Sequence, residues 1–513
     1  MMAISLLSGC TGNFEDYNKN PYGPLSSDLL GDNVETGILI KAMFPAIVQG
    51  QQNNSQMIDQ MIGLEYGGHA SMINPWGNSG NYYTYNPRIG WYGNTFDTSM
   101  PQIYSNFFQI KDKTGGKGVV YAWAEVLRVA ASLKISDCYG PIPYSKFGTG
   151  IQVAYDSQKD VYYRFFEELS NAIEVLTSYN SRTSEPYLED YDYIYNGNVA
   201  NWIKFANTLR LRLAMRISYV DQTKALDEAK AAIDHTIGLM TSVSDNAVLK
   251  QSVSFSFINE WWEAFESFND FRMSATMDCY LKGLQDPRLA SYFKVAKKDG
   301  AYHGVRNGQT SRSQGTLSEA ASSMNVGQAS SILWMDAAET YFLLAEAKLR
   351  LNLGDKTVKE YYEEGVKTSF SSKGASGAES YLDNDVNVPS TSFIDPTNGR
   401  NTDVSRMVST LTVKWDESAS PDKKLERIMV QKWIALFPDG QEAWSEMRRT
   451  GYPGIVTINT NASGGEVATG ELISRLKFPT KEYSDNGENT QAAVSLLKGT
   501  DIAGTRLWWD VKR

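Results

Sequence analysis

The side chains that most often perform catalysis are few and scattered in this chain. Its three histidines, His69, His235 and His303, stand far apart, and neither an HExxH pair nor a GxSxG elbow occurs. The run Gly115-Gly116-Lys117-Gly118 lacks the spacing, and the Ser or Thr after Lys, of a phosphate-binding loop. These residue types predict a protein that is not an enzyme and uses no cofactor or metal. Carboxylates are abundant, so a pair of acids that acts as in a glycosidase remains an alternative.

Aromatic residues gather instead in a segment rich in Gly and Asn, at 71–98. The segment has neither helical nor strand period, so its rings are harder to bury than rings on a helix. Tyr and Trp combine an apolar face with a polar group, which suits sugars, and Asn and Arg can hydrogen-bond to hydroxyls. The alternative is that the rings pack the loop onto the scaffold. The predicted ligand residues here are Trp76, Tyr82, Tyr83, Tyr85, Arg88, Trp91, Tyr92 and Asn94.

A second aromatic patch begins with Phe255 and Phe257 and ends with the adjacent pair Trp261 and Trp262. Neighbouring residues cannot face the same side of a helix, so one of the two tryptophans is expected to be exposed. Both are predicted ligand residues.

Helical periodicity dominates the parts of the chain that must position these loops. Its mixture of small Ala and large aromatic residues is typical of tetratricopeptide-type helical hairpins, but without a strict 34-residue period. We therefore expect a mainly α fold, a scaffold of degenerate hairpins with long loops on one side near 71–98, 250–330 and 371–421. The clearest helical segments are 119–134, 161–176, 202–216, 337–351 and 425–437.

Composition narrows the possible partners. The 513 residues carry a net charge of −10 and no block of Lys and Arg, which argues against nucleic acid. Beyond residue 10 no apolar run approaches the ~20 residues that span a bilayer. Of the three cysteines, Cys138 and Cys279 could form a disulfide, but two buried free thiols are the favoured state.

The segment Leu7-Ser8-Gly9-Cys10 is typical of the site at which bacterial lipoproteins are cleaved and lipidated. The apolar stretch before it is shorter than the ~7–15 residues of a signal peptide, so we expect the natural signal to begin upstream. Residues 1–10 are thus predicted to be a truncated signal that ends at the lipidated Cys10. Residues 11–513 are predicted to form a single binding domain tethered to a membrane surface. A chance cysteine is the alternative.

Several stretches then coincide with one pattern. The segment at 135–144, ISDCYGPIPY, resembles the "SDxYGxIPY" signature of the SusD/RagB family of Bacteroidetes. Further matches follow in the expected order, at 201–216 (NWIKFANTLRLRLAMR), 339–347 (ETYFLLAEA), 431–453 (QKWIALF to GYP) and 475–479 (RLKFP). Together they span nearly the whole chain.

This resemblance implies a nutrient-binding lipoprotein on the outer surface of the outer membrane. Such a protein captures an oligosaccharide or peptide and delivers it to a TonB-dependent transporter. Two other readings remain open: an (α/α)-barrel glycoside hydrolase or lyase, and a helical scaffold whose partners are only proteins.

Most motif residues are expected to hold the fold. Gly140-Pro141 and Pro143 should end the preceding helix in a turn, where Asp137 is expected to bind local backbone. Arg210, Arg212 and Arg216 should pair with carboxylates between helices, and a solvated face is the alternative for Arg212. The spacing of Trp433, Phe437 and Trp444 predicts that their rings point into the core.

Overall fold

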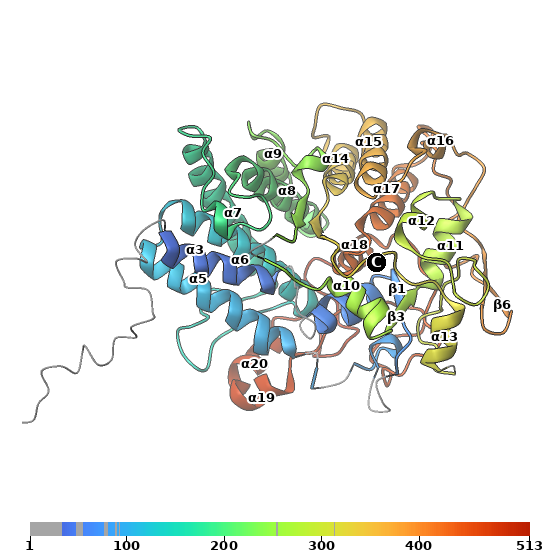
Figure 1. The fold of residues 1–513 in the computed structure, drawn as a ribbon. Helices are drawn as coiled ribbons and strands as arrows, with labels where there is room; N and C mark the ends of the chain where they lie inside the picture. Colours follow the sequence, from blue (N-terminus) through green and yellow to red (C-terminus); the bar gives the residue numbers. More distant parts are fainter. Residues whose placement is uncertain are drawn as a thin grey trace, which may run out of the picture.

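Long helices, packed side by side in antiparallel pairs, form the body of the molecule (Figure 1). The computed structural model describes residues 33–47, 55–75, 81–87, 90–91, 93–252, 255–311 and 313–512. No helix in these ranges combines the length and the apolar character that crossing a bilayer requires. The lipidation prediction at Cys10 lies outside the described residues.

The successive pairs confirm the helical segments expected from periodicity. In each pair the second helix packs back on the first, and the pairs are then joined to their neighbours by contacts such as those between α7 and α8 and between α14 and α17. The pairs are α6 (Gly118–Tyr139) with α7 (Gln158–Asn180), α8 (Val199–Ile217) with α9 (Gln222–Ile233), α14 (Ala337–Leu351) with α15 (Val358–Ser372), and α17 (Pro421–Leu436) with α18 (Gly440–Thr450).

Local sequence explains where these helices begin. The Asn198 side chain accepts a hydrogen bond from the Asn201 amide at 3.1 Å and caps α8. Thr357 and Glu360 form a capping box at the start of α15. Helix α17 begins at Pro421, which suits a first position because the amide it lacks would have no helical partner. The turn predicted after α6 is confirmed, with Gly140 at φ 90°.

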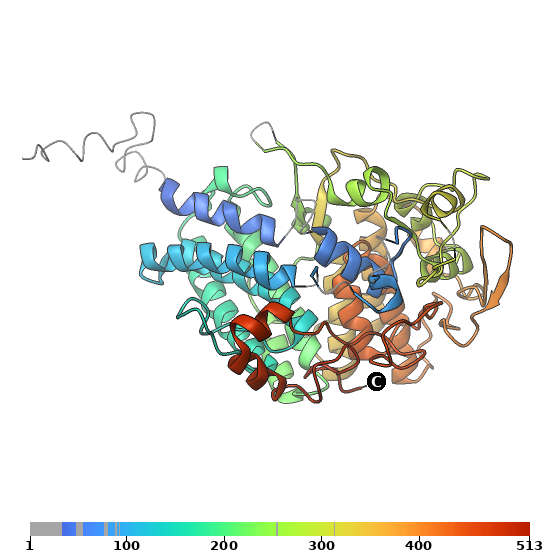
Figure 2. The ribbon, with the colours of Figure 1, turned by 90° about the horizontal axis from the view of Figure 1, so that it is seen from below.

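Smaller elements complete the fold. Helices α3 (Val34–Met43) and α5 (Met100–Thr114) pack beside α6, and the C-terminal segment with α19 (Thr480–Asp485) and α20 (Gly487–Val494) crosses the face seen in Figure 2. The segment expected as a loop at 250–330 contains α10 (Glu260–Trp262), α11 (Ala275–Gly283), α12 (Arg288–Tyr292) and α13 (Gln314–Ala320), and α16 (Ala378–Leu382) follows α15. Further helices of the 3₁₀ or π type are η2 (Phe44–Ala46), η3 (Gln56–Leu64), η4 (Tyr82–Thr84), η5 (Thr95–Ser99), η6 (Glu189–Tyr191), η7 (Val243–Asp245) and η8 (Glu263–Ser267).

The strands form two-stranded antiparallel ribbons that tie distant segments together. In the first, β1 (Ala70–Met72) pairs with β3 (Phe271–Met273), with Ala70 opposite Met273. In the second, β2 (Ala247–Leu249) pairs with β4 (Ile332–Met335), and in the third β5 (Ser392–Ile394) pairs with β6 (Asn401–Asp403). The first ribbon brings the aromatic loop close to the 250–330 segment.

Charged side chains join the helices inside the core. Arg449 reaches both Glu346 and Glu446 at 2.6 Å, and all three are buried. Arg216 pairs with Glu442 at 2.5 Å. The predicted pairing of the arginines is confirmed, and the solvated alternative for Arg212 is wrong because this side chain is buried against Glu339.

The other motif residues also serve the interior. Trp433, Phe437 and Trp444 are buried, as predicted. Asp137 differs from the expectation of a local backbone contact. Its carboxylate accepts hydrogen bonds from Tyr162 of α7 at 2.5 Å and from the indole of Trp509 near the C-terminus at 3.0 Å. The motif carboxylate therefore joins three separate segments of the chain.

Candidate functional site

The aromatic loop divides into a buried part and a half-exposed part. Tyr82, Tyr83 and Tyr85 are 2%, 3% and 6% exposed. Tyr66 packs between the rings of Tyr82 and Tyr85, at centroid distances of 6.5 and 5.8 Å. These three tyrosines therefore fix the loop to the scaffold, and Tyr85 also borders a cavity.

The half-exposed part comprises Trp91 and Asn94. The Trp91 ring packs partly against the core, and the Asn94 amide oxygen accepts a hydrogen bond from the Thr98 hydroxyl at 3.1 Å. Trp76, Arg88 and Tyr92 lie outside the described residues. Among the predicted rings of this loop that the structure describes, Trp91 thus presents the most surface to a ligand.

The aromatic loop meets two other segments that are far from it in the sequence. The backbone amide of Ala462 donates to the Thr84 carbonyl at 2.8 Å, and the Arg306 guanidinium donates to the Thr457 carbonyl at 2.9 Å. The Asn459 amide donates to the carbonyl of Asn307 at 2.7 Å. The 81–87 loop, the 302–311 loop and the 453–472 segment therefore form one continuous region.

A cavity of about 280 Å³ lies within this region. Its lining combines apolar side chains with the polar groups that a hydroxylated ligand needs. The prediction from the aromatic loop included Tyr85 but missed most of the other lining residues, because they come from irregular segments without clustered rings. The missed residues include Arg406, Met407, Ile455, Asn461 and Glu471.

Glu65 is buried beside this region, which we call the loop junction, and is hydrogen-bonded to it through Asn307. Its carboxyl group accepts hydrogen bonds from the Met72 amide and from the Asn307 side chain, both at 2.7 Å. Burial nevertheless raises the pKa of Glu65 to about 8, because the two hydrogen bonds only partly offset the cost of an ionised carboxylate without water. The group is therefore mostly protonated at neutral pH. Asn307 serves here to hold the fold.

The tryptophan pair at 261–262 is separated as its spacing predicts. The Asn259 side chain caps α10 by accepting from the amides of Trp261 and Trp262, at 2.9 and 3.1 Å. Trp261 is 7% exposed and Trp262 is half-buried. Trp262 is thus the ring of this pair that remains accessible.

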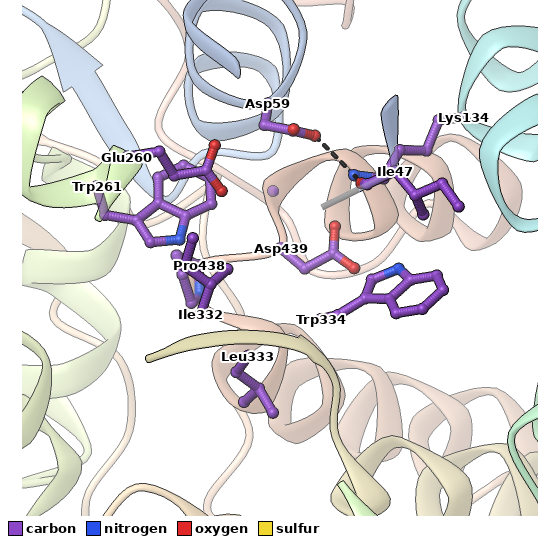
Figure 3. Close-up of a pocket in the computed structure, with 11 residues that line it drawn as sticks. Ile47, Asp59, Lys134, Glu260, Trp261, Ile332, Leu333, Trp334, Pro438 and Asp439 are labelled. Carbon is purple, nitrogen blue, oxygen red and sulfur yellow. Dashed lines mark hydrogen bonds and ion pairs between the residues drawn. The ribbon is translucent and has the colours of Figure 1, made fainter. Parts of the chain in front are cut away.

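Trp261 borders a small cavity whose lining also includes charged side chains (Figure 3). Asp59 pairs with Lys134 at 2.9 Å, and Glu260 accepts a hydrogen bond from the Ser55 hydroxyl. Burial raises the pKa of Glu260 well above its usual range. The cavity measures about 30 Å³, close to the volume of one water molecule, so a glycoside substrate does not fit between these carboxyl groups.

Two further groups relevant to chemistry are inert. Cys138 and Cys279 are buried free thiols, which is the state favoured by the sequence, and burial raises the pKa of each to about 12. Within the described ranges, no three His, Cys, Asp or Glu side chains are grouped in a way that could hold a metal ion.

Comparison with known proteins places these features in a family. Residues 16–510 match the family described as "Susd and RagB outer membrane lipoprotein". No similar protein was found among curated sequences.

Solved structures extend this match over nearly the whole chain. A chitin-binding SusD homolog from Flavobacterium johnsoniae is 36% identical, with 93% of this chain and 99% of that chain covered at a TM-score of 0.89. A SusD homolog from Bacteroides uniformis is 35% identical, with 93% and 99% covered at a TM-score of 0.86. Another, from Bacteroides ovatus, is 34% identical, with 94% and 100% covered at 0.84. The chain therefore belongs to the SusD/RagB family of non-catalytic, nutrient-binding lipoproteins of the outer membrane.

Proposed function

We propose that this protein captures an oligosaccharide at the cell surface and delivers it to a partner TonB-dependent transporter. The observation that carries the proposal is the likeness to a chitin-binding SusD homolog over 93% of the chain, at 36% identity. Oligosaccharides built from N-acetylglucosamine are therefore the first ligands to test. A peptide is the alternative nutrient.

Capture in this proposal requires stacking and hydrogen bonding but no bond cleavage. Trp91 and Trp262 supply half-exposed rings, and Asn94 lies beside Trp91 with an amide side chain. Trp76, Arg88 and Tyr92 remain predicted ligand residues of the same loop. Each ring contact contributes on the order of 1 kcal/mol beyond area burial. Three or four such contacts, about 3–4 kcal/mol together, correspond on their own to a dissociation constant of about 1 mM or weaker.

Delivery rests on the anchoring of the protein. A lipidated Cys10 would hold the binding domain at the membrane where the transporter opens, since acyl chains contribute ~0.8 kcal/mol per buried methylene. Ligand held between the binding domain and the transporter is then released for import. Co-purification of the transporter with the lipidated protein, and its loss for Cys10→Ser in intact membranes, tests this part.

The glycan proposal is tested by calorimetric titration of the purified protein with a panel of chitin oligosaccharides, other glycans and peptides. Trp91→Ala is measured beside Trp508→Ala, which removes a half-buried tryptophan that packs against Tyr162 of α7. We expect saturable binding of a glycan that Trp91→Ala weakens about tenfold and Trp508→Ala leaves unchanged. Binding of peptides alone would contradict the glycan assignment, and release of shortened glycans would support the hydrolase alternative.

A further inference from the structure

A third cavity, separate from the region around Tyr85 and from the small cavity beside Trp261, lies between α3, α5 and the chain after β2. It measures about 580 Å³, which is within the size range of small-molecule sites. Most of its wall is apolar, and Lys41, Gln102 and Ser256 are its few polar side chains apart from the Tyr193 hydroxyl. We call it the α3 groove. Its apolar wall includes Ile38, Phe44, Tyr193, Leu249, Phe255 and Phe257.

The aromatic wall of the α3 groove is held in place by its own contacts. The rings of Tyr193 and Phe255 stack at a centroid distance of 3.8 Å with an angle of 9° between their planes. Phe257 packs against Phe255 at 5.6 Å. The Gln251 side chain donates to the Phe257 carbonyl at 2.8 Å, which fixes the backbone at that ring. A preformed wall of this kind lowers the entropy lost when a ligand binds.

The groove carries an unbalanced positive charge. Lys41 lies with its ammonium nitrogen 4.9 Å from the centre of the Tyr193 ring. Across the described residues, no carboxylate forms an ion pair with Lys41. The acidic residue of the same helix, Glu35, pairs instead with Lys113 at 2.9 Å. The Tyr193 hydroxyl is buried and, within the described part of the chain, has no hydrogen-bond partner.

These contacts limit the chemistry of an occupant. A sugar would leave most of its hydroxyl groups without partners against this wall, and each hydroxyl that is buried without a partner weakens binding. The apolar part of a ligand, by contrast, can pack against the aromatic rings and the aliphatic side chains of the wall. A single anionic group pairs with the Lys41 ammonium.

We propose that the α3 groove binds an amphipathic carboxylate, a small molecule with an alkyl or aryl body and one anionic group. The body lies along the Phe255 and Phe257 wall, and the carboxylate meets the Lys41 ammonium. This site is independent of the proposed glycan capture because its lining contains none of the residues assigned to that capture, in the aromatic loop or at Trp262.

The proposal is tested by calorimetric titration of the purified protein with decanoate below its micelle concentration. Decylamine, of the same chain length and opposite charge, and glucuronate, an anion without an apolar body, are titrated beside it. We expect decanoate to bind with a stoichiometry of one and at least tenfold more tightly than either of the other two. Equal affinity for decanoate and decylamine, tighter binding of glucuronate, or no binding of decanoate would overturn the proposal.

Variants locate the site. Lys41→Met keeps the length of the side chain without its charge and should weaken decanoate binding about tenfold, whereas Lys117→Met, an exposed lysine outside the groove, should not. Ala42→Trp, which fills the groove from α3, should abolish binding. Unchanged decanoate affinity in both groove variants would refute the location. Thermal unfolding confirms that each variant is folded, and glycan titration should give the wild-type result for all of them.

Discussion

The helical core and the loop junction bury carboxyl groups in opposite ways. In the core, Glu346 and Glu446 both face Arg449, and these contacts lower the pKa of each carboxylate in spite of the desolvation that opposes it. At the loop junction, Glu65 is buried with only two hydrogen-bond donors, and its pKa rises to about 8. For these three residues, the shared guanidinium of Arg449 keeps Glu346 and Glu446 ionised, whereas the two neutral donors around Glu65 do not offset the desolvation of its carboxyl group.

The exposure of aromatic rings also differs between regions of the molecule. Trp433 and Trp444 on the helices are buried, as their spacing predicts. The loop tyrosines are also enclosed, whereas Trp91 and Trp262 remain half-exposed. Ring exposure in this protein therefore follows the tertiary position of each residue and not the kind of segment that carries it.

The strongest test of the core is Arg449→Ala. The substitution leaves Glu346 and Glu446 buried without their shared guanidinium, so we expect a loss of about 3–5 kcal/mol in the free energy of unfolding. Urea unfolding monitored by tryptophan fluorescence measures this loss.

The control is Arg164→Ala, which breaks an exposed ion pair in which the Arg164 guanidinium lies 2.9 Å from the Glu167 carboxylate. Exposed pairs are worth at most about 1 kcal/mol, so its effect should be much smaller. A similar loss in both variants would mean that burial does not distinguish these ion pairs.

The two parts of the aromatic loop are compared by Tyr82→Ala and Trp91→Ala. Tyr82 is buried against Tyr66, so its removal leaves a cavity, and we expect a loss of about 3 kcal/mol in stability. Trp91→Ala should cost less than about 1 kcal/mol while reducing glycan affinity. Differential scanning calorimetry separates the two, and a reversed order would show that Trp91 anchors the loop.

The loop junction is tested by Glu65→Gln through its pH dependence. The folded pKa of about 8 lies above the usual value of 4.5, so the contribution of Glu65 to stability is fully present below about pH 4.5 and is lost as the pH rises from there through 8. Glutamine keeps an acceptor and does not titrate. From pH 5 to pH 8.5 the variant should therefore gain stability relative to wild type by more than the ~1.4 kcal/mol of one pKa unit.

Urea midpoints of both proteins at the two pH values give this difference. A constant difference would mean that the pKa of Glu65 is not raised in the folded protein. The same pair of measurements on Glu346→Gln, whose carboxylate faces Arg449, should show no such gain at high pH.

Local patterns were sufficient for much of the fold. The apolar period of 202–216 predicted α8 because residues three and four apart share one helical face, and the charges along it predicted ion pairs. Gly140 and the prolines after it predicted the end of α6 for a similarly local reason. The pairing of Arg212 with Glu339 joins positions 127 residues apart and was beyond local reasoning.

The candidate sites depended on contacts between distant segments. The Tyr85 cavity takes its wall from residues 406–472, and the α3 groove brings Lys41, Tyr193 and Phe255 together from three separate regions. No period or spacing along the chain encodes such proximity.

By itself, then, the sequence determined the helical scaffold, its ordered motifs and the family to which they belong, because helix formation and motif identity are properties of neighbouring residues. Only the tertiary structure decided which rings are exposed, which acids are neutral and where cavities lie. Burial, dielectric environment and cavity shape arise from side chains that meet across hundreds of residues, as Glu65 and Asn307 do, 242 positions apart.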